Sequence, residues 1–213
     1  MTAVWFVGGS GLVGSFVEAK LAHDGGLVSF GRRVSSAPFQ RQIDFDRLPE
    51  LVDDNGGCET AISCLGTTIR TAGSEAAMRR VDHDYVVAFA AAAKARGARQ
   101  FILVSSVGAN SSSRNFYLRL KGETERDVGL LGFERADILR PGLLLGERKE
   151  IRPGERFAAL LSPLLGVFMV GGLDKYRGIR AETVASAITN LVGAPENGVI
   201  VHGNREIEVL ASG

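Results

Sequence analysis

The sequence predicts a single α/β domain in which helices cover both faces of a parallel sheet. Short apolar runs alternate along the chain with longer helix-like segments, as expected of repeated strand-helix units. The apolar runs are hydrophobic throughout rather than at every second residue, which is typical of strands buried on both faces. A glycine-rich turn follows the first run. These three observations favour an open, doubly wound sheet.

The expected elements of the first half begin with Val4–Val7, four apolar residues in succession that predict a buried strand. After the glycine turn, Leu12–Ala22 has the pattern of a helix. Further strands are expected at Leu27–Phe30, Arg41–Asp44 and Thr60–Leu65. Ser74–Arg96 predicts a long helix that ends at Gly97, and the alanines of its inner part would let it pack closely on the sheet.

The second half of the chain repeats this alternation and then departs from it. Strands are expected at Gln100–Ser105 and Ala136–Leu139, with a helix at Phe116–Val128 between them. After Gly146 the pattern becomes irregular, which predicts that 147–213 contributes a small C-terminal substrate cap to the one domain of 1–213. The elements expected there are a helix at Val184–Val192 and a late strand at Gly198–His202.

Length and charge agree with one globular domain. A chain of 213 residues can bury a core without disulfides or metals. A formal net charge of +1 gives no indication of nucleic-acid binding. The longest apolar stretch, Phe157–Leu173, is interrupted by Pro163 and glycines and is shorter than the ~20 residues of a membrane span. We therefore expect neither a nucleic-acid partner nor a transmembrane segment.

The turn after the first strand has the glycine spacing of a dinucleotide-binding loop. Gly8, Gly11 and Gly14 lie three residues apart, directly before the first helix. Glycines there allow a tight turn, a close approach of the backbone to a pyrophosphate, and close packing of helix on strand. The helix amino terminus adds N–H donors and the positive end of a dipole. The cofactor contacts expected in this segment are Gly8, Ser10, Gly11, Leu12, Val13 and Gly14.

The end of the second strand indicates NADP(H) rather than NAD. NAD sites usually have a carboxylate there for the ribose hydroxyls, whereas this chain has Arg32 and Arg33. Two guanidinium groups can pair with a 2′-phosphate. Asp44 and Phe45, after the third strand, are expected beside the adenine, with the Asp44 carboxylate accepting from its amino group.

A serine pair and a tyrosine–lysine pair follow in the second half. Ser105 and Ser106 come at the carboxyl end of the fifth strand, where open parallel sheets bind ligands. Tyr117 and Lys121 are four residues apart on the next helix, so their side chains share one face. A phenolate beside a fixed ammonium is stabilised, which suits tyrosine for proton transfer. We expect Ser106, Tyr117 and Lys121 to be catalytic, with Ser105 as the alternative serine.

With these motifs the chain resembles the short-chain dehydrogenase/reductase superfamily, whose fold is a Rossmann-type doubly wound sheet. The likeness rests on the glycine loop, on Ser105-Ser106, on Tyr117-Leu-Arg-Leu-Lys121 and on Leu139-Arg140-Pro141-Gly142. It is closer still to one atypical branch, the oxidoreductases similar to the human Tat-interacting protein. The segments that resemble this branch are Cys64–Thr68, Val81–Val86, Leu118–Glu123 and Arg152–Glu155.

The resemblance implies NADPH binding and catalysis by the serine, tyrosine and lysine named above. The further cofactor contacts that we expect are Cys64, Leu65, Gly66, Thr67, Ser105, Tyr117, Lys121, Pro141 and Gly142. One departure concerns the end of the fourth strand, where the superfamily often has asparagine and this chain has Cys64. The usual asparagine of a proton relay is therefore not found there. His83, between two aspartates, is expected on a helix surface or in a subunit contact.

These features favour an NADPH-dependent reductase of a carbonyl substrate, such as an apolar aldehyde, ketone or quinone. Three alternatives stay open: an epimerase-like isomerase of nucleotide sugars, an NADPH sensor that binds proteins, and a lipid-surface protein. Phe157–Leu173 could form a core-covering helix pair, a pocket wall, or a surface for lipid or another subunit. No metal site is expected, and the oligomeric state stays open. Cys58 and Cys64 indicate no disulfide, and the amino terminus lacks the pattern of a signal peptide, so we expect a cytoplasmic location.

Overall fold

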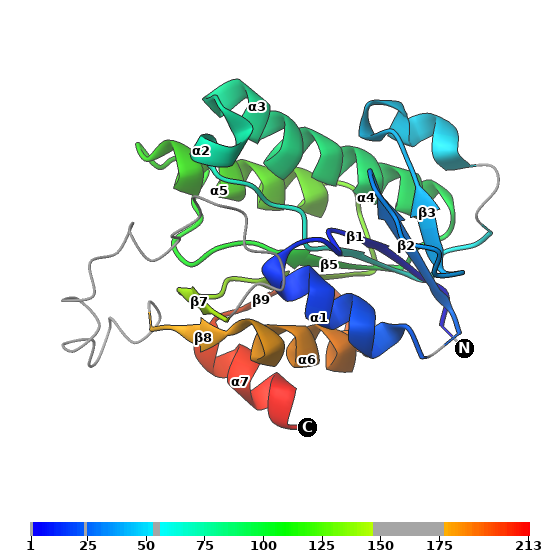
Figure 1. The fold of residues 1–213 in the computed structure, drawn as a ribbon. Helices are drawn as coiled ribbons and strands as arrows, with labels where there is room; N and C mark the ends of the chain where they lie inside the picture. The colour runs from blue at the N-terminus through cyan, green and yellow to red at the C-terminus, as the bar shows by residue number, and fades with distance from the viewer. Residues whose placement is uncertain (1, 24, 53–55, 147–176) are drawn as a thin grey trace.

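Seven short strands form the main sheet of the computed structural model, which describes residues 2–23, 25–52, 56–146 and 177–213 (Figure 1). All strand pairs in this sheet are parallel, and the order is β3-β2-β1-β4-β5-β6-β9. The strands are β1 Val4–Val7, β2 Leu27–Gly31, β3 Gln40–Gln42, β4 Thr60–Ser63, β5 Gln100–Val104, β6 Arg135–Leu139 and β9 Gly198–His202. A separate parallel pair consists of β7 Leu144–Leu145 and β8 Ile179–Arg180.

The strand order reverses between β1 and β4, which are neighbours in the sheet. From β1 the chain proceeds outward through β2 to β3, and from β4 it proceeds the other way through β5 and β6 to β9. The register places Val4 opposite both Leu27 and Thr60. In such sheets the crevice outside the carboxyl ends of the strands at this reversal is where ligands bind. The doubly wound Rossmann-type fold predicted from the sequence is confirmed.

Helices cover both faces of the sheet, with α3, α4 and α5 on one side and α1, α6 and α7 on the other (Figure 1). The α-helices are α1 Leu12–Leu21, α2 Ile69–Ala72, α3 Glu75–Arg79, α4 Tyr85–Ala95, α5 Phe116–Gly129, α6 Ala181–Leu191 and α7 Asn204–Ser212. A 3-10 segment, η1, spans Phe45–Val52, and a π-helical turn, η2, spans Arg80–Asp84. The single helix expected over 74–96 is therefore α3, the π turn and α4 in succession.

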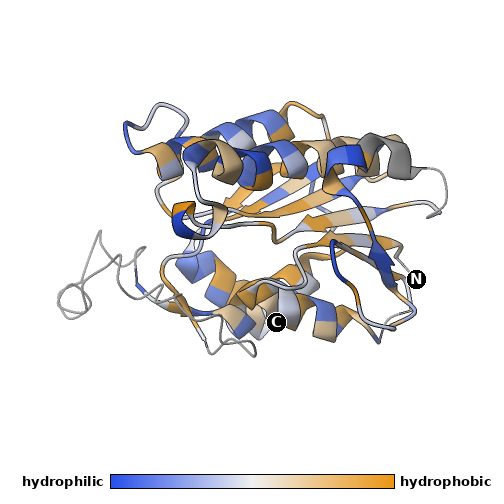
Figure 2. Cartoon of the chain, turned by 45° about the horizontal axis from the view of Figure 1, so that its top comes forward, coloured by the Kyte–Doolittle hydropathy of each residue, from blue (hydrophilic) through white to orange (hydrophobic). Residues whose placement is uncertain are grey.

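Each face of the sheet has its own hydrophobic core, because alternate side chains of a strand point to opposite faces. On one side Phe6 and Ile62 of the sheet pack with Val17 of α1 and Ile188 of α6. Figure 2 shows the strands as largely hydrophobic and the helices on both sides as mixtures of hydrophobic and hydrophilic residues.

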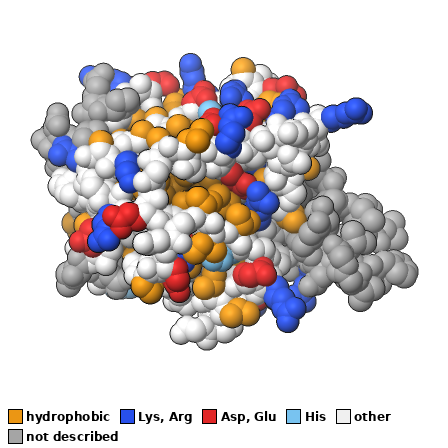
Figure 3. Space-filling view, turned by 180° about the vertical axis from the view of Figure 1, so that it is seen from behind, with side chains coloured by type: hydrophobic (Ala, Val, Ile, Leu, Met, Phe, Trp, Pro, Cys, Tyr) orange, Lys and Arg blue, Asp and Glu red, His pale blue; other side chains and the backbone are white. Residues whose placement is uncertain are grey.

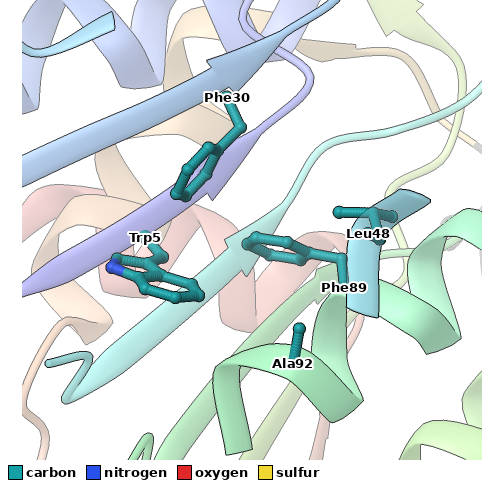
Figure 4. A pocket seen from close by; sticks show the side chains of 5 residues that line it. All are labelled: Trp5, Phe30, Leu48, Phe89 and Ala92. Carbon is teal, nitrogen blue, oxygen red and sulfur yellow. The ribbon is translucent and has the colours of Figure 1, made fainter. Parts of the chain in front are cut away.

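The other core is rich in aromatic rings. Trp5, Phe30 and Phe89 stack edge to face there, with ring centroids 5.2 and 6.3 Å apart. These rings, with Leu48 and Ala92, surround a hollow of about 10 Å³ (Figure 4). A space of this size holds at most one water molecule, so we regard it as a packing defect of the core.

The carboxyl-terminal elements from residue 177 onward extend the main domain. The helix expected in the cap is α6, which packs against α1 and α7, and the expected late strand is β9 at the edge of the sheet. Val199 and Val201 of β9 are exposed, and Figure 3 shows hydrophobic side chains gathered on the face opposite to that of Figure 1. Phe157–Leu173 lies outside the described residues. Among the helices that are described, none is both long and apolar enough to cross a membrane.

Candidate active site

The glycine loop between β1 and α1 packs so closely that side chains are excluded at two positions. Gly8 has a φ of +101°, and a Cβ atom there would lie 2.5 Å from the carbonyl carbon of Cys64, directly after β4. A Cβ on Gly14 would lie 2.0 Å from the carbonyl oxygen of Gly8. The amide of Gly11 donates to that same oxygen at 2.9 Å, which closes the turn. The loop thus joins β1, β4 and α1 closely at the reversal of strand order, as a pyrophosphate site requires.

Helix α1 begins at Leu12, directly after this loop. Its N-cap residue is Gly11, in an extended conformation, and glycine has no side chain to occupy the first N–H groups of the helix. These donors and the helix dipole can therefore serve an anion. Ser10 is exposed at the loop, whereas the side chain of Val13 is buried in the core. Val13 can thus offer a ligand only its backbone.

The residues predicted to bind the adenosine end lie around the end of β2 and the start of η1. Arg32 and Arg33 are exposed, and within the described chain neither guanidinium has an ion-pair partner. The carboxylate of Asp44 accepts the amide of Asp46 at 3.0 Å and so starts η1. Phe45 is buried and packs against Tyr85, with ring centroids 5.3 Å apart. Asp44 is exposed, so it is the more accessible of the predicted adenine neighbours.

Lys121 is a buried ammonium in the second turn of α5. Its helix begins after Asn115, whose side-chain oxygen accepts the amide of Leu118 at 3.1 Å. The Lys121 side chain is 7% exposed, and Nζ lies 2.9 Å from Oδ1 of Asp82. Burial lowers the pKa of Lys121, but the charges of Asp82 and Tyr117 raise it more, so the pKa lies above its ordinary value. Lys121 therefore stays charged near neutral pH, one helical turn from Tyr117.

Asp82 is the residue of this site that the sequence analysis missed. It lies in the π turn η2 with its side chain 1% exposed, and its second oxygen accepts the amide of Thr67 at 2.7 Å. A Cβ atom on Gly66 would lie 3.6 Å from Asp82 Oδ1 and 3.8 Å from Lys121 Nζ, so the absence of a side chain leaves space beside the ion pair. The sequence signal for it is the segment Val81–Val86, where Asp82 directly precedes His83.

The two serines after β5 have different surroundings. Ser105 is buried and its hydroxyl donates to Glu125, which also forms an ion pair with Arg140. Ser106 is half-buried, and among the described residues its hydroxyl donates to the carbonyl of Val107 at 3.3 Å, a long hydrogen bond. The hydroxyl of Ser106 is therefore more available to a ligand than that of Ser105. Which of the two serines faces a substrate stays a prediction.

The loop that carries Ser106 rests directly on α5. A Cβ atom on Gly122 would lie 2.2 Å from the amide nitrogen of Ser111. The amide of Asn110 also donates to the carbonyl of Leu118 at 3.0 Å. Because Gly122 follows Lys121, the absence of a side chain there lets the serine loop approach α5 closely beside Lys121.

The remaining predicted contacts lie at the ends of β4 and β6. The amide of Val107 donates to the carbonyl of Pro141 at 3.0 Å, and that of Gly142 donates to Asn204 at 2.8 Å. Burial raises the pKa of the Cys64 thiol to about 12, which keeps it protonated. Leu65 packs partly into the aromatic core. No group of three His, Cys, Asp or Glu side chains that could hold a metal occurs among the described residues.

Comparison with known proteins identifies relatives over most of the chain, although no family model matches it. Protein HTATIP2 of Rattus norvegicus is 40% identical over 159 residues, which are 75% of this chain and 64% of the rat protein. Protein fmp52, mitochondrial, of Aspergillus fumigatus is 32% identical over 99% of this chain and 95% of its own length. The FMP52 protein of Coccidioides immitis is 33% identical, with 99% and 94% covered.

The fungal relatives correct the predicted cytoplasmic location. Their names place them in mitochondria, so the expectation of a cytoplasmic protein is wrong. The inference had rested partly on Cys58 and Cys64, which are not in a disulfide. Unpaired cysteines indicate a reducing compartment, but they do not distinguish one reducing compartment from another.

Solved structures with the same fold include sugar-nucleotide enzymes. UDP-glucose 4-epimerase from Thermotoga maritima, solved with UDP-glucose, has a TM-score of 0.70 and 15% identity over 98% of this chain and 81% of that one. MoeE5 in complex with UDP-glucose and NAD has a TM-score of 0.68 and 18% identity, with 98% and 80% covered. At these identities the likeness supports the fold alone. With its near full-length relatives, this chain belongs to the NAD(P)-binding, atypical short-chain dehydrogenase/reductase family that includes HTATIP2 and FMP52.

Proposed function

We propose that the protein is an NADPH-dependent reductase that converts a carbonyl compound to an alcohol. The observation that carries this proposal is the buried Lys121 ammonium, held 2.9 Å from Asp82 at the ligand-binding edge of the sheet. A charged lysine one helical turn from Tyr117 stabilises a phenolate, which is the form that tyrosine takes after donating a proton. The location of this ion pair, beside a tyrosine and at the carboxyl edge of the sheet, supports a catalytic role for Lys121.

The same edge supplies groups for each part of the cofactor. The glycine loop and the start of α1 would hold the pyrophosphate, because a Cβ at Gly8 or Gly14 would collide with neighbouring backbone. Arg32 and Arg33 would pair with the 2′-phosphate. Asp44, with Phe45 behind it, is proposed beside the adenine. The residues proposed along the nicotinamide half are Cys64, Leu65, Gly66, Thr67, Ser105, Pro141 and Gly142.

The proposed reaction uses three side chains. When bound, NADPH supplies the hydride that adds to the carbonyl carbon. Tyr117 donates its proton to the carbonyl oxygen, and Lys121 stabilises the phenolate that remains. Ser106 donates a hydrogen bond to the oxygen as negative charge develops on it. Tyr117 regains a proton from solvent before the next turnover.

Calorimetry with NADPH and NADH tests the cofactor assignment. NADPH should bind more tightly, and the Arg32→Ala, Arg33→Ala double variant should lose about tenfold or more of that preference, because charged hydrogen bonds to the phosphate disappear. Arg205→Ala, an exposed arginine on α7, is the matched control and should leave both affinities unchanged. Equal affinity of the unmodified protein for the two cofactors would contradict NADP(H) preference.

A nucleotide-sugar epimerase is the second candidate, because the similar solved structures include UDP-glucose 4-epimerase. An epimerase returns the hydride to its substrate, so no net oxidation of NADPH occurs, whereas a reductase consumes one NADPH for each carbonyl reduced. A panel of aldehydes, ketones and quinones assayed by NADPH oxidation, beside UDP-sugars assayed for interconversion, separates them. Turnover of the UDP-sugars alone would favour the epimerase.

We also infer a mitochondrial location from the names of the fungal relatives. Fractionation of cells that produce the tagged protein tests this. Recovery of the protein with mitochondrial markers is expected, and recovery with cytosolic markers alone would contradict it.

A further inference from the structure

The π turn between α3 and α4 places a carboxylate between two parts of the candidate active site. One oxygen of Asp82 lies 2.9 Å from Nζ of Lys121 on α5, and the other accepts the amide of Thr67 at 2.7 Å, on the loop after β4. The Asp82 side chain is 1% exposed. Both oxygens therefore bind groups of the site, one a catalytic side chain and one the backbone of a proposed cofactor loop.

This π turn is fixed against α5 by neighbouring contacts. The hydroxyl of Thr124 lies 3.0 Å from the carbonyl oxygen of Asp82. His83 lies between two carboxylates, with Nε2 2.9 Å from Asp127 on α5 and Nδ1 2.8 Å from Asp84. A π turn widens the helix locally, and such turns occur frequently at functional sites. Here the widened turn directs Asp82 inward and His83 toward the outer side of α5.

Asp82 is the counter-ion of Lys121. The other charged or titratable groups that face the ammonium are Tyr117 and Glu125, both on α5. Glu125 is already paired with Arg140 and accepts the hydroxyl of Ser105. The loop after β4 contributes only Gly66 at this point. Burial favours the neutral amine, so removal of the Asp82 charge should release a proton from Lys121.

We propose that Asp82 is a positioning residue that keeps Lys121 charged and holds the loop after β4 against the catalytic helix. One oxygen of Asp82 binds Lys121 and the other binds the loop after β4. Cofactor binding at Gly66–Thr67 and activation of Tyr117 therefore depend on the same carboxylate. This inference rests on the proposed reductase function for its catalytic meaning. The electrostatic part of it concerns the cofactor-free protein alone and can be tested there.

The first test is a pH titration of the Lys121 side chain by carbon-13 NMR in the cofactor-free protein. Lys121→Met assigns the signal. In the unmodified protein the midpoint should lie at or above that of an ordinary lysine, about 10.4. Asp82→Asn keeps an oxygen for the Thr67 amide but removes the charge, so the proton affinity of Lys121 should fall at least about tenfold. The midpoint should then move to lower pH.

The matched control is Asp127→Asn. Asp127 on α5 contacts His83 of the same π turn, so this variant also removes a carboxylate that holds the turn, but one that does not face Lys121. If Asp82 acts only by holding the turn in place, both variants should shift the Lys121 midpoint equally, and that result would overturn the proposal. A midpoint of the unmodified protein below that of ordinary lysine would overturn it too, without any variant. A shift confined to Asp82→Asn supports it.

The second test measures the reaction itself. The assay uses a carbonyl substrate that the unmodified protein reduces. The rate of Asp82→Asn should fall at alkaline pH, around the lowered titration midpoint of Lys121. The rate of the unmodified protein should not fall at that pH. Above that midpoint the dissociation constant of Asp82→Asn for NADPH should also rise, because Lys121 then loses the positive charge that faces the anionic cofactor. If no carbonyl is reduced by the unmodified protein, the proposed function fails while the NMR titration still decides the role of Asp82. An unchanged pH profile beside a shifted titration would overturn the catalytic part.

Discussion

Tyr117 and Lys121 lie one helical turn apart on α5, and this spacing puts the phenol and the ammonium on one face of the helix. Tyr117→Phe removes one hydroxyl and keeps the ring, so folding and NADPH affinity should barely change. A general acid contributes typically about 10²–10⁴-fold, and kcat should fall within that range. The measurement is steady-state NADPH oxidation with a carbonyl substrate, beside calorimetric binding of NADPH.

Lys121→Ala provides the comparison at the same site. It removes the ammonium beside the phenol and leaves Asp82 buried without its counter-ion, so both turnover and cofactor affinity should decline. An NADPH sensor predicts another pattern, in which Tyr117→Phe has no effect in any assay. Full turnover by Tyr117→Phe would show that another group donates the proton.

Asp137 is a buried carboxylate away from the candidate site, and its contacts indicate a structural role. It has 0% exposure and accepts hydrogen bonds from Arg135 at 2.6 and 2.8 Å, from His202 at 2.8 Å and from Gln100 at 2.9 Å. Burial alone would raise the pKa of Asp137, but hydrogen bonds from His202, Arg135 and Gln100 lower it more, so the net shift is downward. The folded state therefore favours its ionised form.

The sign of that shift gives a prediction for acid stability. A folded pKa below the unfolded value of about 3.9 contributes stability that is present at neutral pH and lost as pH falls below about 4. Asp137→Asn should lower the free energy of unfolding by about 1–3 kcal/mol at pH 7, because the buried Arg135 loses its buried charge partner and keeps only the exposed Glu196. Below pH 4 the variant should lose less further stability than the unmodified protein. Chemical denaturation at pH 7 and pH 3 measures both effects.

Glu134→Gln is the control for this prediction. Glu134 pairs with Arg99 at the protein surface, 2.6 Å apart, and such exposed pairs contribute little. A loss for Glu134→Gln equal to that for Asp137→Asn would contradict a role for burial.

At the scale of elements, the glycine loop and α5 give opposite expectations for the same substitution. Gly14→Ala places a Cβ 2.0 Å from the Gly8 oxygen, so the loop or α1 must move, and both stability and NADPH binding should decline. Gly129→Ala, at the end of α5, meets nothing within 4 Å and should raise stability by about 0.4–1 kcal/mol. Thermal unfolding with and without NADPH measures both. Tolerance of Gly14→Ala would contradict the packing of the loop.

Most elements could be predicted because each is short, apolar and bounded by a turn signal. Val4–Val7 and Gln100–Val104 satisfy this description, and the glycine spacing marks the first crossover. The π turn could not be predicted, because one extra residue in a helical turn changes neither composition nor mean hydropathy. Asp82 was missed for the same reason: its contacts with Thr67 and Lys121 join residues 15 and 39 positions away, which only the packed structure brings together.

At the scale of the whole molecule, cofactor binding should appear as thermal stabilisation. A ligand at 100 times its dissociation constant adds about 2.7 kcal/mol to the free energy of unfolding. For a domain of this size each kcal/mol corresponds to about 2–4 °C, so NADPH should raise the Tm by about 5–10 °C. NADH at the same concentration should raise it less. Equal Tm values with and without NADPH would contradict cofactor binding.

The pairing of β7 with β8 also bears on how this fold can diversify. Leu144 lies opposite Ile179, and the amide of Ile179 donates to the carbonyl of Leu143 at 2.8 Å, so the chain on the two sides of 147–176 is fastened at one place. An insert whose two ends are held together can change in length and sequence at little entropic cost to the rest of the domain. Changes in the length of 147–176 should therefore leave the main sheet and its ligand-binding edge largely undisturbed, because the β7–β8 pair already brings the two flanking segments together.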